Sequence, residues 1–211
     1  MQTTTKTTAR RIALLTALPL VGALALTGCS SDDDDRDDVA APAASAPAAS
    51  APSVASDGSS SAAATAGNDA LPTAAATARK AVGSGTVTAI EQEAGGTSWE
   101  VLVVTADGRE QEVHVDADGR RTTAGPTKET SDADDVAEAK RFVGAADLSV
   151  AQAASALTKT VSGTVTELGL DDHAGAVVWE GDVLDASGTK HSIRIDAGSG
   201  EVVTNTVDTD D

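Results

Sequence analysis

Cysteine is almost absent from this chain, with Cys29 the only one among 211 residues. A single cysteine cannot form a disulfide within the chain. If Cys29 is used elsewhere, as argued below, no thiolate remains for catalysis or for binding a metal. We therefore expect the folded part of the protein to be stabilised by packing alone.

Basic side chains are also scarce: 15 Lys and Arg residues face 33 Asp and Glu residues, giving a net charge of −18. Removal of a basic N-terminal segment, argued below, would make the charge −21. A surface this acidic repels phosphate backbones and anionic lipid headgroups, which excludes nucleic acid as an expected partner. Cationic partners and loosely bound divalent ions stay open as alternatives.

The apolar run at residues 12–26 is too short to span a bilayer. It has 15 residues, whereas a spanning helix needs about 20. Lys6, Arg10 and Arg11 precede it, and this order of a basic segment and a short apolar segment is typical of a secretory signal peptide. The sequence therefore predicts that residues 1–28 are a signal peptide.

The four residues after this run resemble the lipobox of bacterial lipoproteins, with Leu26, Thr27 and Gly28 directly before Cys29. In that family the cysteine sulfur receives a diacylglyceryl group and the signal peptide is cut just before it. The resemblance implies a lipoprotein anchored through Cys29 to the outer face of the cell membrane, with the remaining chain extracytoplasmic. The alternative is an ordinary signal peptide with a cysteine there by chance.

Residues 29–68 have the composition of a spacer. An acidic run at 32–38 is followed at 39–68 by a segment of mainly Ala, Ser, Pro, Gly and Thr. Such segments bury too little apolar surface to offset the entropy of ordering, so we expect a disordered linker. The acidic run lacks the turning loop that a calcium site needs.

Three short motifs occur twice in the same order. They are GTVT at 85–88 and 163–166, WE at 99–100 and 179–180, and DA at 116–117 and 196–197. This order predicts a duplication, with repeats at residues 69–125 and 147–211 and a helical connector at 126–146.

Each repeat is predicted to begin with an amphipathic helix and continue as an antiparallel meander, an α+β arrangement. Ser149 is the expected helix cap in the second repeat, and Ser131 with Asp134 the expected capping box of a connector helix over 134–145. The expected strands are 86–92, 98–104 and 111–116 in the first repeat and 164–170, 177–184, 191–196 and 201–204 in the second.

A helix followed by the patterns G-x-V, W-E-V-x-V and D-A-x-x-G resembles the PepSY domain, over about residues 70–123 and 147–204. The carriers are 85–87, 99–103 and 116–119 in the first repeat and 163–165, 179–183 and 196–200 in the second. Gly181 departs from the pattern, as does Arg120-Arg121. The family occurs in propeptides of secreted metallopeptidases and in envelope proteins, where a role in restraining peptidases has been proposed. The resemblance therefore implies a non-catalytic module and a peptidase partner.

One strand is expected to be apolar on both faces. Trp99, Val101 and Val103 share the core face, whereas the opposite face carries Glu100, Leu102 and Val104. Packing of one repeat on the other and an exposed patch for a partner are both compatible with this pattern. Glu100, Leu102 and Val104 are therefore the candidate partner surface.

The motifs of enzymes and metal sites are mostly missing. The chain lacks G-x-S-x-G, H-E-x-x-H and a phosphate loop, and its S-x-x-K match at Ser187 to Lys190 lies in an expected hairpin. His114, His173 and His191 do not have metal-ligand spacing. We expect no cofactor, no metal and no catalysis. The leading hypothesis is a module that binds or restrains a secreted or envelope peptidase; a structural envelope tether and an enzyme of another type are the alternatives.

Overall fold

The computed structural model describes residues 66–207, which fold as three helices and eight strands. The elements are α1 (Leu71–Val82), β1 (Thr86–Glu93), β2 (Ser98–Val104), β3 (Glu110–Asp116), β4 (Thr122–Lys128), α2 (Ala133–Ala145), α3 (Val150–Thr160), β5 (Gly163–His173), β6 (Ala176–Asp185), β7 (Lys190–Asp196) and β8 (Val202–Val207). None of the helices in this range is long and apolar enough to cross a membrane. The predicted signal peptide, the lipobox with Cys29 and nearly all of the predicted spacer lie outside the described residues.

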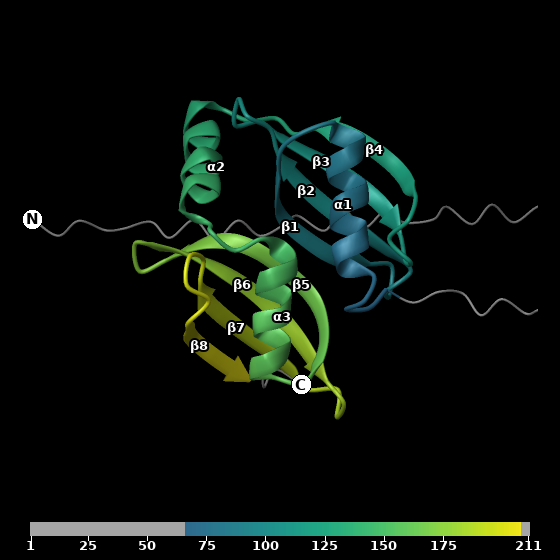
Figure 1. The fold of residues 1–211 in the computed structure, drawn as a ribbon, viewed down its shortest axis with the longest axis vertical. Coiled ribbons are helices and arrows are strands. Elements are labelled where there is room, and N and C mark those ends of the chain that lie inside the picture. The colour runs from purple at the N-terminus through teal and green to yellow at the C-terminus, as the bar shows by residue number, and fades with distance from the viewer. Residues whose placement is uncertain (1–65, 208–211) are drawn as a thin grey trace, which may run out of the picture. The chain divides into compact units, whose positions relative to one another are not determined.

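All eight strands form one antiparallel sheet in the order β4-β3-β2-β1-β5-β6-β7-β8 (Figure 1). The strands expected to make a sheet in each repeat are joined at the centre, where β1 pairs with β5. Ala89 lies opposite Gly169 and Glu91 opposite Glu167 in this pairing. The α+β class predicted from the sequence is confirmed, whereas the single continuous sheet was not foreseen.

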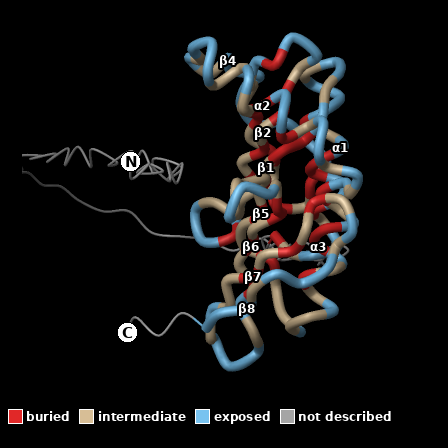
Figure 2. The backbone as a smooth tube through the Cα atoms, turned by 90° about the vertical axis from the view of Figure 1, so that its left-hand side faces the viewer, coloured by how far each residue is buried: buried red, intermediate tan, exposed pale blue. Residues whose placement is uncertain are grey.

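Helices α1 and α3 lie side by side on one face of this sheet and enclose the core (Figures 1 and 2). Trp99 and Trp179 are fully buried beneath them. Each indole N–H donates to a backbone carbonyl at 3.2 Å, from Trp99 to Ala117 and from Trp179 to Leu148. Both rings therefore belong to the core, as the sequence predicted.

The residues that begin two helices are mostly those expected. The Ser149 hydroxyl accepts the Gln152 N–H, and the Gln152 side chain accepts the Ser149 N–H, completing a capping box at α3. At α2 the capping box is Asp132 with Asp135, one residue later than the Ser131 and Asp134 pair predicted. The Asp132 carboxylate accepts the N–H groups of residues 134 and 135 at 2.9 and 3.0 Å, because the backbone of Asp132 is extended there.

Helix α2 packs against the end of β1 and β2 rather than beside α1 and α3 (Figure 1). It buries Ala139 and Phe142. Its Arg141 guanidinium lies 2.6 Å from the Asp172 carboxylate near the end of β5. α2 therefore contacts strands from both halves of the sheet.

The chain enters the fold at the centre of the sheet. The Asn68 side chain donates to the Gly163 carbonyl at 2.8 Å and accepts the Val165 N–H at 2.9 Å, so it pairs with the start of β5. The Ala66 N–H donates to the Gly96 carbonyl in the β1–β2 turn. These bonds hold the segment before α1 to strands of both halves.

The packing of α3 over β6 explains why position 181 is a glycine. A Cβ at this position would lie 2.5 Å from the Leu157 side chain of α3 and 2.8 Å from the Glu167 carbonyl. The corresponding positions in the first half carry Ala78 in α1 and Val101 in β2, and both are fully buried. The larger of the two side chains therefore belongs to the helix in the second half and to the strand in the first half.

Strand β4 was missed from the sequence. All seven of its residues are exposed, and it contains Gly125 and Pro126, so it shows no alternation of apolar and polar residues. It pairs with β3 in an irregular register. An exposed edge strand of this composition lacks the pattern by which strands are recognised.

We expect Gly181→Val to lower the free energy of unfolding by about 1–3 kcal/mol, because the added methyl groups overlap Leu157. Leu157→Ala alone should cost about 2–5 kcal/mol through the cavity that it leaves. The double variant should be more stable than the sum of the two costs predicts, because it reproduces the pairing of Val101 with Ala78. Urea unfolding of the three variants measures this coupling, and strictly additive costs would contradict it.

Candidate functional site

A row of directly opposed side chains crosses the face of the sheet that points away from α1 and α3. The register pairs the members of this row in the order His114, Glu100, Glu91, Glu167 and Asp182, from β3 through β2, β1 and β5 to β6. Four acidic side chains thus lie next to one another on four adjacent strands. Directly opposed like charges destabilise a sheet, so this row requires an explanation.

The crowding of negative charge raises the pKa values of carboxyl groups in the row. Burial raises the pKa of Glu167 to about 7, and the charges of Glu91 and Asp182 add to the shift, while Lys190 opposes it. Burial and the charges of Glu93 and Asp182 also raise the pKa of Glu91. Part of the row therefore carries protons near neutral pH.

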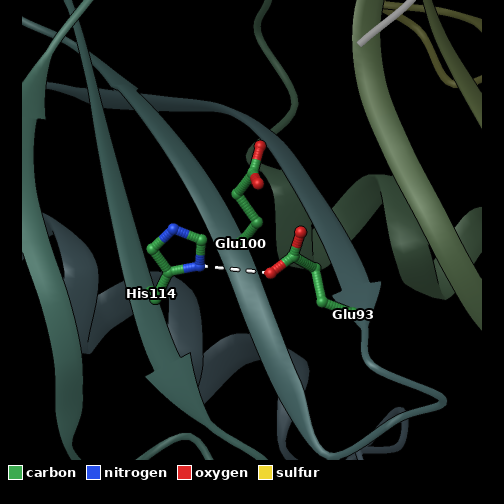
Figure 3. Close-up of side chains that lie close together, drawn as sticks. All are labelled: Glu93, Glu100 and His114. Atoms are coloured by element: carbon green, nitrogen blue, oxygen red, sulfur yellow. Dashed lines mark ion pairs between the residues drawn. The ribbon is translucent and has the colours of Figure 1, made fainter. Parts of the chain in front are cut away.

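His114 lies close to Glu93 and Glu100 on this face (Figure 3). Its Nδ1 is 3.2 Å from a Glu93 carboxylate oxygen, and its Nε2 is 2.9 Å from a Glu112 carboxylate oxygen. One ligand atom each from Glu93, Glu100 and His114 lie within 4.8 Å of one another. Burial raises the pKa of Glu100 to about 7, helped by the charges of Glu112 and Glu93.

The second half of the sheet carries an arginine in the place of this histidine. Arg194 lies opposite Glu180, as His114 lies opposite Glu100. Its guanidinium donates two hydrogen bonds to the Glu180 carboxylate, at 2.7 and 2.8 Å. A bidentate pair of this kind is a strong charge-assisted interaction. Arg194 therefore pairs with the glutamate directly opposite it, whereas the His114 ring contacts Glu93 and Glu112.

The candidate partner surface is narrower than the sequence suggested. Glu100 and Leu102 are half-buried on the outward face of β2. Val104 is only 3% exposed, because it lies at the end of β2 where α2 packs, so it is withdrawn as a contact residue. The two halves of the sheet do not cover this face by stacking, because they pair edge to edge through β1 and β5.

Exposed apolar side chains on the edge strand β8 were missed from the sequence. They are Val202, Val203 and Val207, each 46–50% exposed. Leu184, two strands away on β6, is also 41% exposed. Within the described residues no strand pairs with the outer side of β8. The residue pattern of a strand predicts its two faces but not whether that strand lies at the edge of a sheet, so nothing in the pattern of β8 marks it as an edge strand.

The S-x-x-K match does not form a catalytic pair. The Ser187 hydroxyl donates to the Asp185 carboxylate at 2.6 Å, and the Lys190 ammonium lies 3.1 Å from Asp182. The two side chains therefore contact different aspartates, and Ser187 closes the β6–β7 turn.

Residues 147–204 match the family model of the peptidase propeptide and YPEB domain, PepSY. This region is the second of the two predicted from the sequence, and the resemblance is confirmed for it. A solved structure of a candidate lipoprotein from Clostridium difficile 630 is 16% identical to the chain, with a TM-score of 0.44, over 67% of this chain and 95% of that one. No curated protein matches the chain.

We expect Glu167→Gln to stabilise the protein at about pH 8 and to have little effect at about pH 4.5. The folded-state pKa of about 7 lies above the ordinary 4.5. The stability linked to this carboxyl is therefore fully present below pH 4.5 and is lost as the pH rises through 7. The amide cannot ionise, so the gain at high pH should be about 1 kcal/mol after allowance for solvent screening.

Urea unfolding at the two pH values checks this expectation. Glu201→Gln, on an exposed residue before β8, is the matched control for the exchange of a carboxylate for an amide, and it should change the free energy of unfolding by less than about 0.5 kcal/mol. A gain from Glu167→Gln of the same size at both pH values would contradict the role of ionisation.

Proposed function

We propose that the protein is an extracytoplasmic lipoprotein whose PepSY-like modules bind and restrain a secreted or envelope peptidase without performing chemistry. The match of residues 147–204 to the PepSY family carries this proposal. The lipobox pattern that ends at Cys29 supports the membrane anchor. The anchor would keep the modules at the outer face of the cell membrane, where a secreted peptidase passes.

We further propose that the first half of the sheet is a second module of the same kind. Both halves run from one helix into four strands, α1 to β4 and α3 to β8. Trp99 and Trp179 occupy corresponding buried positions in β2 and β6. In the second half a large helix residue, Leu157, lies over the small strand residue Gly181. In the first half a small helix residue, Ala78, corresponds to Leu157, and the larger Val101 corresponds to Gly181. Compensating changes of this kind are expected when two copies of one module diverge.

The β8 edge is the proposed contact for the peptidase. An unpaired edge strand offers backbone N–H and C=O groups to an extended segment of a partner, which can add to the sheet as a further strand. β8 has no proline and no charged residue, and Val202, Val203 and Val207 are exposed along it. The opposite edge, β4, contains Pro126 and Lys128, both of which hinder pairing.

A structural tether of the envelope is the second candidate. The acidic run at 32–38 and the Pro/Ala/Ser-rich segment at 39–68 favour it, because such a spacer would hold a folded part away from the membrane. In that case removal of the protein alters the envelope and leaves secreted proteolysis unchanged.

The purified full chain, titrated into the secreted peptidases of its source organism, should lower proteolysis of a protein substrate. Val203→Lys should weaken this inhibition about tenfold or more, because a charge on an edge strand opposes strand addition. Thr123→Lys on β4 is the matched control and should inhibit like the unmodified chain.

Three outcomes of this titration decide between the candidates. Unchanged proteolysis at saturating protein would reject the peptidase proposal and favour the tether. Inhibition that is insensitive to Val203→Lys would move the contact away from β8. Equal weakening by both substitutions would point to charge in general rather than to one edge.

A further inference from the structure

We propose that Glu93, Glu100 and His114 bind one divalent transition-metal ion on the outward face of the first half of the sheet. This inference is independent of the peptidase proposal. It revises the sequence-based expectation of no metal, which rested on the spacing of the three histidines along the chain. Spacing along the chain does not show ligands that the pairing of strands brings together.

The geometry of the three side chains fits a metal centre. Glu93 comes from β1, Glu100 from β2 and His114 from β3, three adjacent strands of the sheet. Their ligand atoms lie within 4.8 Å of one another, so a small shift of side chains brings all three to one ion. Side-chain exposures of 28% for His114 and 37% for Glu93 leave the site open to an ion from solvent.

The surroundings of the imidazole are those of a metal-bound histidine. Histidines that bind metals commonly donate the second ring N–H to a carboxylate, which fixes the ring and the tautomer. Here Nε2 lies 2.9 Å from the Glu112 carboxylate. That bond leaves Nδ1 to bind the ion, and Nδ1 is the atom that faces Glu93 (Figure 3).

In the second half of the sheet, the positive charge at the corresponding place belongs to a side chain of the protein itself. There the arginine at position 194 supplies a permanent positive charge to Glu180 through two hydrogen bonds. In the first half one histidine faces three carboxylates, those of Glu93, Glu100 and Glu112. A bound divalent ion would supply the charge that the histidine alone does not.

The ligand set selects the class of ion. Two carboxylates and one imidazole suit Zn²⁺ and similar first-row ions, and three protein ligands leave coordination positions for water or a further ligand. Ca²⁺ takes six to eight oxygen ligands, and an imidazole does not belong to that set. We therefore expect Zn²⁺ to bind more tightly than Ca²⁺.

The test uses the full chain, freed of metal with a chelator and dialysed against Zn²⁺. Elemental analysis should find one ion per chain, and competition with excess Ca²⁺ should not displace it. NMR of ¹⁵N-labelled imidazoles reports on His114, His173 and His191 together. The Nδ1 resonance of His114 should shift on binding while those of the other two histidines stay unchanged.

Two substitutions and one control make the assignment specific. Glu100→Gln removes a ligand. His114→Arg replaces the metal-binding imidazole by a guanidinium, the group that Arg194 already places at the corresponding position in the second half. Both should weaken Zn²⁺ binding at least 30-fold. His191→Gln, beside Asp185, should leave it unchanged, and circular dichroism of each variant verifies folding.

The proposal is overturned if His114→Arg binds Zn²⁺ as tightly as the unmodified chain. It is equally overturned if the shifted resonances belong to His173 or His191, or if the unmodified chain binds no Zn²⁺ in dialysis. Peptidase inhibition is measured separately, so failure of this site leaves the proposed function intact and the reverse also holds.

Discussion

The pairing of β1 with β5 is the interaction on which the rest of the fold depends. It joins two four-stranded halves into one sheet and places α1 and α3 side by side over a continuous core. The same pairing brings Glu91 opposite Glu167, so the acidic side chains of the two halves form one row. A sheet interrupted at this point would have two smaller cores and two separate sets of charges.

Two β-bulges decide which side chains enter that row. The registers shift between Val87 and Ala89 in β1 and between Val165 and Glu167 in β5. An extra residue in a strand reverses the faces of all residues after it. The bulges turn Ile90 and Leu168 into the core and the glutamates outward. Strict alternation counted from Val87 or Val165 would have placed those glutamates inside.

The sequence predicted what depends on local patterns and missed what depends on contacts between distant segments. The stripes of the opening helices, the cap at Ser149 and the burial of Trp99 and Trp179 follow from spacing and residue type. The burial of Val104 depends on α2, and the cluster around His114 depends on the register of three strands. Neither the burial of Val104 nor the cluster around His114 can be predicted from the sequence of a single segment.

The attachment of Asn68 to β5 has a mechanical consequence. Tension on the N-terminal side of the folded unit acts first on the hydrogen bonds that the Asn68 side chain donates to Gly163 and accepts from Val165, and on the hydrogen bond from the Ala66 N–H to the Gly96 carbonyl. The load is therefore delivered to the middle of the sheet, where strands of both halves share it. A chain that entered at the outer strand β4 would instead allow its strands to be peeled away one at a time.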